Sequence, residues 1–265
     1  MPQIAQGSGR QLTSRQEFIE AARGDKRKIN KELDALEAKV RGFLFRAKVA
    51  NLGSRITRIR IDKSIAAYER FLDGTGGVVD YDPRWFLQHP VVRGAETQVH
   101  QHFGNWMIGV GKPKRRTSAL HQELLRLKDG KRITVREPWE ANIEFRNEHK
   151  YDDHRLLVRT SNIRGVGELT FARKGNVIEV SGVVTHTIAD PFEFTPGRVN
   201  NFFGIEKVVH NEMLWLEAHG RAKRFTVRSV WRRRVTMRLR LGKDPVTGKR
   251  RITGFVEEPK WSDLQ

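Results

Sequence analysis

The stretch from Gly167 to Phe194, GELTFARKGNVIEVSGVVTHTIADPFEF, decides how the C-terminal half of this chain folds. Two extended runs rich in apolar and β-branched residues meet at Lys174-Gly175-Asn176, which is a sequence typical of a tight hairpin turn. The second run leads into a turn that contains acidic and aromatic residues. We therefore predict an antiparallel hairpin whose second strand ends in a cluster of polar side chains.

Other short runs rich in β-branched and aromatic residues flank this hairpin and predict further strands. These runs are 133–135, 143–145, 156–160, 224–230, 235–241 and 252–256. One helix is predicted among them, at 204–218, whereas the apolar residues of 26–49 and 61–72 recur at helical spacing. We predict an α+β protein with a mainly helical N-terminal region, 1–130, and a mostly antiparallel, barrel-like β domain containing one helix, 131–265.

Basic residues greatly outnumber acidic ones, and the formal charge is +19 over 265 residues. Such a surface attracts polyanions, including nucleic acid, anionic lipid headgroups and phosphorylated intermediates. Basic residues are densest between positions 221 and 251. We predict that Arg228, Trp231, Arg232 and Arg234 bind the anionic partner, with the indole available for stacking. A solvated face is the alternative interpretation of the same run.

The cysteine content and hydropathy say little about compartment. No cysteine is present, which excludes disulfides and thiolate zinc ligands but fits the cytosol and a secreted toxin equally well. The N-terminal residues lack the apolar segment of a conventional export signal, and no run approaches the roughly 20 apolar residues that span a bilayer. We expect no conventional signal peptide and no transmembrane segment.

Candidate catalytic residues gather where the second hairpin strand ends. His186 lies on the apolar face of that strand by the two-residue period, and Asp190, Glu193 and Arg198 follow it. His210 lies on the next predicted helix. Carboxylates bind divalent ions or activate water, arginine neutralises phosphate and imidazole moves protons. We predict these five residues as catalytic, with Asp190 and Glu193 as metal ligands, and keep a structural histidine and a solvated turn as alternatives.

Two other polar groups are weaker candidates. His100 and His102 would share one side of a strand at a spacing that metal sites use, but no third ligand is near in sequence, so we expect a structural or surface role. Asp152, Asp153 and His154 form a compact polar group that a metal-dependent nuclease would use. A solvated turn is the interpretation that we favour for this second group.

The hairpin stretch, followed by a helix and then by GRAKRFTVRSVW, resembles the catalytic region of the colicin M family. In that family an Asp-x-Tyr-Asp motif follows the hairpin, with His and Arg after it. Asp190 corresponds to the first acid, Phe192 to the tyrosine, Glu193 to the second acid and Arg198 to the arginine. The resemblance covers residues 164–245, and it departs from the motif because Phe192 lacks the phenol, Glu193 is longer than aspartate and no histidine adjoins Arg198.

The resemblance implies an antibacterial toxin that hydrolyses a phosphate-linked lipid precursor of peptidoglycan, with Mg²⁺ as cofactor. It also implies synthesis in a bacterial cytoplasm, delivery to a target cell, action in the periplasm, and delivery and immunity proteins as partners. Two alternatives remain open from the residues alone. They are a metal-dependent nuclease toxin and a non-catalytic basic module that binds nucleic acid.

Overall fold

The computed structural model describes residues 26–53, 61–109, 115–145, 153–158, 160–197, 199–202 and 206–264. The chain divides into two compact units. Unit 1 comprises residues 1–80, 145–160 and 190–228, and unit 2 comprises residues 81–144, 161–189 and 229–265. Each unit therefore takes residues from both sides of the boundary predicted near residue 130. Helices and a mixed sheet together confirm the α+β class.

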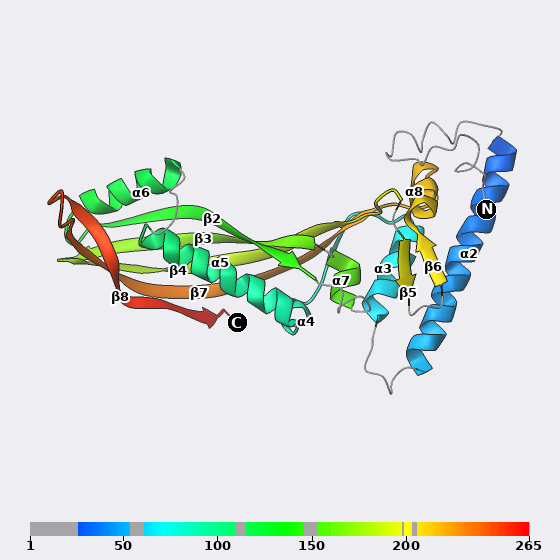
Figure 1. The fold of residues 1–265 in the computed structure, drawn as a ribbon, viewed down its shortest axis with the longest axis horizontal. Coiled ribbons are helices and arrows are strands. Elements are labelled where there is room, and N and C mark those ends of the chain that lie inside the picture. Colours follow the sequence, from blue (N-terminus) through cyan, green and yellow to red (C-terminus); the bar gives the residue numbers. More distant parts are fainter. Residues whose placement is uncertain are drawn as a thin grey trace. The chain divides into compact units, whose positions relative to one another are not determined.

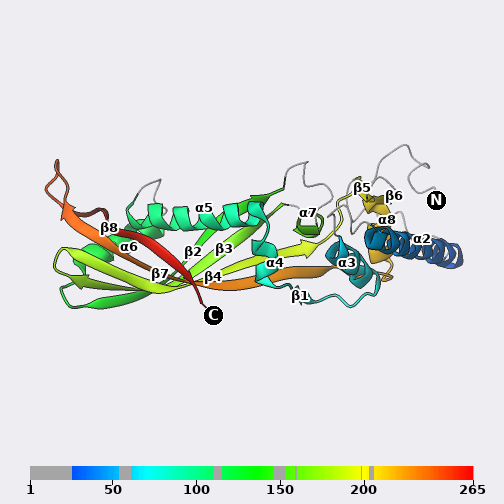
Figure 2. The same ribbon diagram turned by 90° about the horizontal axis from the view of Figure 1, so that it is seen from below.

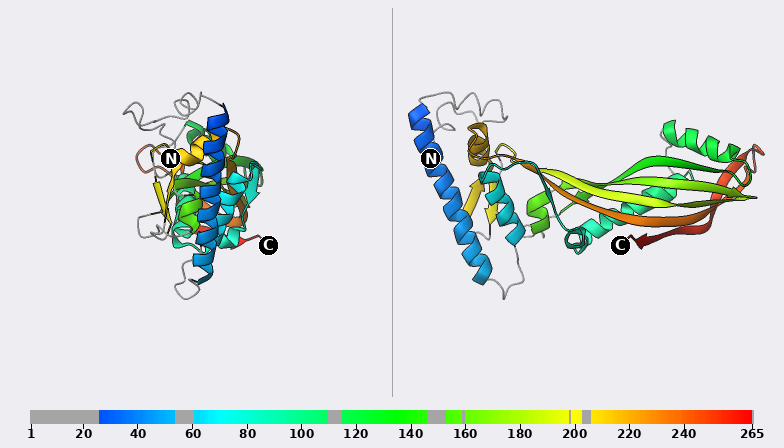
Figure 3. Two further views of the ribbon diagram at one scale, coloured as in Figure 1. Left: turned by 90° about the vertical axis from the view of Figure 1, so that its right-hand side faces the viewer. Right: turned by 180° about the vertical axis from the view of Figure 1, so that it is seen from behind.

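The described helices of unit 1 build an α-helical core (Figure 3). They are α2 (Lys26–Gly53), α3 (Asp62–Leu72), α7 (Asp153–Val158) and α8 (His210–Ala218). Helix α2 packs against α3 and α8, and α3 packs against α7. Leu33, Leu36, Val40 and Leu44 form the buried stripe of α2. The long amphipathic helix predicted from this spacing is confirmed.

Unit 1 also contains short strands. Strand β5 (Val199–Phe202) pairs with β6 (Glu206–Val209) in the antiparallel sense, and β1 (Val78–Asp80) pairs in parallel with residues 226–228. The helix predicted at 204–218 is therefore wrong in its first part, because residues 206–209 form a strand and the helix begins at His210. The β-branched pair Val208-Val209 favours the extended conformation.

The large sheet contains five long strands in addition to β1. They are β2 (Arg132–Glu144), β3 (Thr160–Lys174), β4 (Val177–Phe192), β7 (Phe225–Lys243) and β8 (Arg250–Asp263). Their order is β7-β4-β3-β2, and both β1 and β8 pair with β7 along its other side. The sheet is therefore open over the described residues, and the predicted barrel-like closure is wrong. The runs predicted at 224–230 and 235–241 are parts of the single strand β7.

The predicted hairpin is confirmed as β3 and β4. Lys174 pairs with Val177, and Gly175 takes a φ of 59° at the turn, a left-handed conformation that glycine adopts without steric cost. Farther along the hairpin, Gly182 lies opposite Leu169. A Cβ at Gly182 would lie 2.2 Å from the carbonyl oxygen of Glu168, so only glycine allows the two strands this close approach.

Helices α4 (Pro83–Leu87), α5 (Pro90–Met107) and α6 (Arg115–Arg126) belong to unit 2, and α5 lies lengthwise over one face of the sheet (Figures 1 and 2). Val92, Val99, Phe103 and Met107 are buried at helical spacing. Phe103 packs edge-on against Trp139 of β2, with ring centroids 4.8 Å apart. The strand expected around His100 is therefore wrong, and the strand predicted at 156–160 is wrong for residues 156–158, which end helix α7.

Candidate functional site

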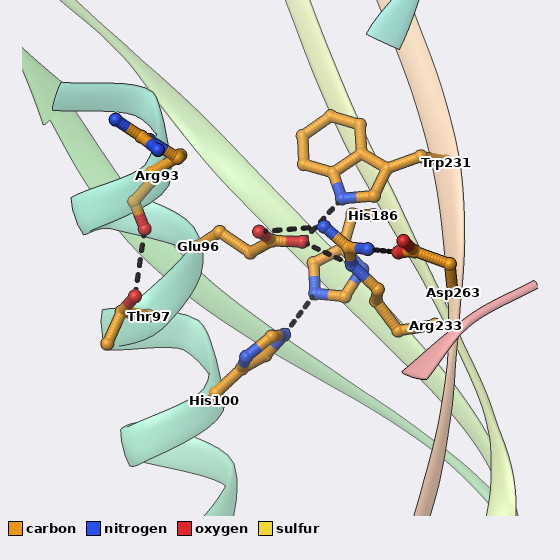
Figure 4. Close-up of polar contacts among 8 residues, drawn as sticks. All are labelled: Arg93, Glu96, Thr97, His100, His186, Trp231, Arg233 and Asp263. Carbon is orange, nitrogen blue, oxygen red and sulfur yellow. Dashed lines mark hydrogen bonds and ion pairs between the residues drawn. The ribbon is translucent and has the colours of Figure 1, made fainter. Parts of the chain in front are cut away.

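A polar cluster in unit 2 joins α5 to strands β4, β7 and β8 (Figure 4). Glu96 and His100 are one helical turn apart on α5, so both side chains lie on the same face of the helix. His186 projects from the buried face of β4. Trp231 and Arg233 are two residues apart on β7 and therefore lie on the same side of that strand. The side chains from all of these elements meet between the helix and the sheet.

Glu96 is a buried carboxylate that accepts three hydrogen bonds. Oε1 accepts from Trp231 Nε1 at 2.7 Å and from Arg233 Nε at 2.8 Å, and Oε2 accepts from Arg233 Nη2 at 3.1 Å. Burial acts to raise the pKa of Glu96, but the hydrogen bonds from Arg233 and Trp231 outweigh it and lower this pKa below its ordinary value. Arg233 also pairs with Asp263, its partner in the β7–β8 register. Glu96 is therefore ionised at neutral pH and its charge is paired.

The imidazoles of His100 and His186 face each other, with their Nε2 atoms 3.3 Å apart. His186 is fully buried and lies parallel to Trp231, with ring centroids 5.4 Å apart, whereas half-buried His100 stacks on Trp261 at 3.7 Å. Burial lowers the pKa of each histidine to about 4. Both rings are therefore neutral at pH 7, the state in which imidazole shares a hydrogen bond or binds a metal.

Three of these side chains are placed to hold a metal ion. One ligand atom each from Glu96, His100 and His186 lies within 4.8 Å of the other two. The described residues contain no second group of three such ligands, so Asp190 and Glu193 belong to none. Sequence reasoning singled out His186 and considered His100, but it missed Glu96. The signal for Glu96 is its spacing of four residues from His100, which has meaning only if this segment is helical.

Asp190 and Glu193 lie in unit 1, where both line a cavity of about 250 Å³. Asp190 is half-buried, and Glu193 is exposed and accepts a hydrogen bond of 3.2 Å from Arg224 Nη1. Arg224 also forms a bidentate ion pair with Glu217, at 2.6 and 3.0 Å. The two acids predicted as metal ligands therefore share one cavity beside a guanidinium, whereas predicted His186 belongs to the cluster in unit 2.

The remaining predicted catalytic residues do not enlarge this site. His210 is 0% exposed, and its Nδ1 accepts a hydrogen bond of 2.8 Å from the backbone N–H of Thr195. Its ring also packs edge-on against Phe194, with centroids 5.1 Å apart. This imidazole therefore fixes the turn after β4, and its role in proton transfer stays a prediction. Arg198 lies outside the described residues.

The position that corresponds to the family tyrosine is part of the core of unit 1. Phe192 is buried and stacks on Phe225, with ring centroids 5.0 Å apart. Tyr68 packs edge-on against Phe192 at 5.2 Å and lines the same cavity as Asp190 and Glu193. A phenol is therefore present at this cavity, but it comes from helix α3 instead of position 192.

The residues predicted to bind a polyanion separate into three environments. Arg232 and Arg234 are exposed on the solvent face of β7. Trp231 points to the opposite face, where it is 7% exposed and its Nε1 donates a hydrogen bond to Glu96. The prediction that this indole stacks on a ligand is therefore wrong. Arg228 belongs to unit 1 and forms a bidentate ion pair with Asp80, at 2.6 and 2.8 Å.

The polar group considered for a nuclease has a structural explanation in its described part. Asp153 accepts hydrogen bonds from the backbone N–H groups of Ser64 at 2.8 Å and Lys63 at 3.1 Å, and from the Ser64 hydroxyl. It therefore caps the first turn of α3. Burial raises the pKa of Asp153, although the bonds from Ser64 oppose the shift. His154 is buried and Asp152 lies outside the described residues, so the favoured solvated turn is wrong for Asp153 and His154.

Comparison with protein-family models, curated proteins and solved structures gave no match for this chain. Within the part of the chain that the structure describes, no helix combines the length and apolar character needed to cross a membrane.

Proposed function

We propose that this protein is an antibacterial toxin that hydrolyses a phosphate-linked lipid precursor of peptidoglycan at the unit 1 cavity. The observation that carries the proposal is that Asp190 and Glu193, the acids that the resemblance to the colicin M family selects, line one cavity. Mg²⁺ binds in many enzymes through one or two carboxylates together with substrate phosphates. Asp190 and Glu193 would hold this ion, which supplies a Lewis acid for a phosphoryl oxygen.

Other features of unit 1 suit an anionic phosphate group. Arg224, hydrogen-bonded to Glu193, adds positive charge near the cavity, while its Nε and Nη2 donors are bound to Glu217. The cavity of about 250 Å³ is close to the lower end of ligand pockets, which is on the order of 300 Å³. It therefore suits the phosphate-bearing end of a lipid-linked substrate better than its whole length. The charge of +19 would draw the protein to an anionic membrane surface.

The proposal includes a route to the substrate. The toxin would be made in a bacterial cytoplasm, delivered to a target cell and active in the periplasm, where the lipid-linked precursor is used. Delivery or docking is the role predicted for residues 1–130, although Tyr68 of this region also lines the cavity. A delivery protein and an immunity protein would be its partners.

The test directs the protein to the periplasm or to the cytosol of a test bacterium. The variants are Asp190→Ala and Glu193→Gln, and the matched control is Asp80→Asn, which alters an exposed acid of the same unit outside the cavity. We expect lysis only after periplasmic expression, cleaved precursor in the lipid extract, and loss of both effects in the two cavity variants alone. Toxicity confined to the cytosol with degraded nucleic acid would instead support the nuclease, and the absence of toxicity would reject both enzymes.

One observation favours the second candidate, a basic module that binds nucleic acid. Arg232 and Arg234 are exposed at alternating positions of β7, so they line one face about 6.8 Å apart, and exposed Arg240 lies on the same face six residues farther along the strand. A ladder of this kind suits successive phosphates. Replacing Arg232 and Arg234 with alanine should then lower the magnitude of the slope of log K against log salt by about 1.4 in a titration with single-stranded DNA. An unchanged slope would reject this candidate.

A further inference from the structure

Unit 2 contains the donor atoms of a metal site that the proposed hydrolysis does not use. We propose that Glu96, His100 and His186 together bind one divalent transition-metal ion of the zinc class. The three ligands belong to unit 2, whereas the acids Asp190 and Glu193 belong to unit 1. The site therefore stands on its own geometry, and it would remain if the proposed hydrolytic activity were disproved.

The separation of the two imidazoles matches shared coordination. Zinc binds histidine nitrogen at about 2.0–2.1 Å in a tetrahedral site, which places two such nitrogens about 3.4 Å apart. The Nε2 atoms of His100 and His186 are 3.3 Å apart and already point at each other. An ion can therefore bridge both nitrogens with small movements of the two rings.

Glu96 retains an acceptor position for the ion. An ionised carboxylate offers about four lone-pair sites, and Glu96 uses three of them for Trp231 and Arg233. Oε2 accepts a single hydrogen bond, whereas Oε1 accepts two. The free position of Oε2 is the third ligand that we assign. The hydrogen bonds to Oε1 would orient the carboxylate, as partners of metal ligands generally do.

The charges around the cluster suit a dication. Arg233 is the cation closest to Glu96, and Asp263 pairs with it from β8. The two carboxylates together outweigh the one guanidinium, which leaves one net negative charge beside the site for the ion. Two imidazole nitrogens with one carboxylate oxygen favour zinc, cobalt, nickel or copper, whereas Mg²⁺ and Ca²⁺ prefer oxygen ligands alone.

The surroundings hold the ligands in place and leave one side accessible. Trp231 lies parallel to His186, and Trp261 stacks on His100, so each ring has an aromatic wall. Glu96 and His186 are buried, but His100 remains half-buried. An ion would enter on the side of His100, and its fourth coordination position would be left to water. Coordination would tie α5 directly to β4.

The competing explanation is a direct hydrogen bond between the two neutral imidazoles, which also brings nitrogen atoms close together. The two explanations differ in their response to added metal. Coordination requires both Nε2 atoms to be unprotonated, with the ring protons on Nδ1, whereas the direct hydrogen bond keeps a proton on one of the two Nε2 atoms. Metal binding by the purified full-length chain therefore distinguishes them.

The experiment titrates chelator-treated full-length protein with Zn²⁺ by calorimetry and with Co²⁺ by visible absorption. The variant is His100→Ala, and the matched control is His102→Ala on the same helix, since His102 is exposed and bonds only to the carbonyl of Glu140 in the described residues. We expect one ion per chain in the wild type and the control, tetrahedral Co²⁺ bands, and at least about tenfold weaker binding in His100→Ala. Mg²⁺ should not compete.

A measurement on the wild type keeps the proposal testable even if His100→Ala does not fold. Zn²⁺ should shift the imidazole ¹⁵N resonances of His100 and His186 in NMR spectra and leave those of His102 unchanged. The proposal is overturned if the wild type binds no zinc, if His102→Ala weakens binding as much as His100→Ala, or if the ¹⁵N signals of the pair do not respond. Each of these results is obtained without any assay of hydrolysis.

Discussion

Neutralising Glu96 should destabilise unit 2 far more than neutralising an exposed acid with the same kind of partner. Glu96→Gln keeps the shape of the side chain but removes the charge that faces Arg233 and Trp231 at 2.7–3.1 Å. Breaking a buried ion pair by removing one partner costs about 3–5 kcal/mol, since the other charge stays buried and poorly solvated. The amide oxygen can still accept one hydrogen bond and Arg233 keeps its ion pair with Asp263, so we expect a loss at the lower end of this range, about 3 kcal/mol.

The matched control is Glu257→Gln in unit 2. Glu257 accepts a hydrogen bond of 3.1 Å from Arg238 Nη1, but the side chains of Arg238 and Glu257 are 42% and 43% exposed. Surface ion pairs contribute little because water solvates each charge well. The control should therefore leave the unfolding midpoint of the protein unchanged.

The assay is urea unfolding of metal-free protein followed by indole fluorescence. This signal reports mainly on unit 2, which contains five of the six tryptophans. The free energy of unfolding comes from linear extrapolation of the unit 2 transition. If Glu96→Gln and Glu257→Gln lower this free energy equally, or if Glu96→Gln changes it by less than about 1 kcal/mol, the claim that burial makes the Glu96 pair important is wrong.

Acid should weaken metal-free unit 2 as the pH falls from 6.5 toward 4, because folded His100 and His186 have a pKa of about 4 and their unfolded forms bind protons in this window. The stabilisation is complete above the unfolded pKa. Glu96 and Arg233, which face the two histidines, keep their charges through most of this pH range. A variant with both histidines changed to glutamine should therefore lose the pH dependence of the urea midpoint. Gly182→Ala should reduce the free energy of unfolding by about 3 kcal/mol, because its Cβ would meet a backbone oxygen at 2.2 Å. Wild-type stability in that variant would show that the hairpin relaxes without strain.

Several elements could be predicted from the sequence because their signals are local. The stripe of α2 recurs every three or four residues, and burial of Leu33 and Leu44 follows from that period alone. The turn at Gly175 follows from the conformations that glycine permits. In both cases the residues that determine the structure lie within a few positions of one another.

Other predictions failed because short apolar runs are compatible with both strand and helix. Residues around His100 read as a strand, but the period from Val92 to Met107 suits the helix that covers the sheet. Residues 206–209 read as helix, but they pair with β5. These choices depend on the partner that covers each apolar face, and partners distant in sequence leave no local signal.

The candidate sites show the same division between local and distant information. The sequence by itself determined that Asp190 and Glu193 end a strand of the hairpin, and that His186 lies on the buried side of that strand. Only the tertiary structure decided that His186 meets Glu96 and His100, because His186 is more than eighty positions from both and reaches them only when α5 packs on β4. Side-chain chemistry can be listed from sequence, but the distances that make it a site arise from packing between elements.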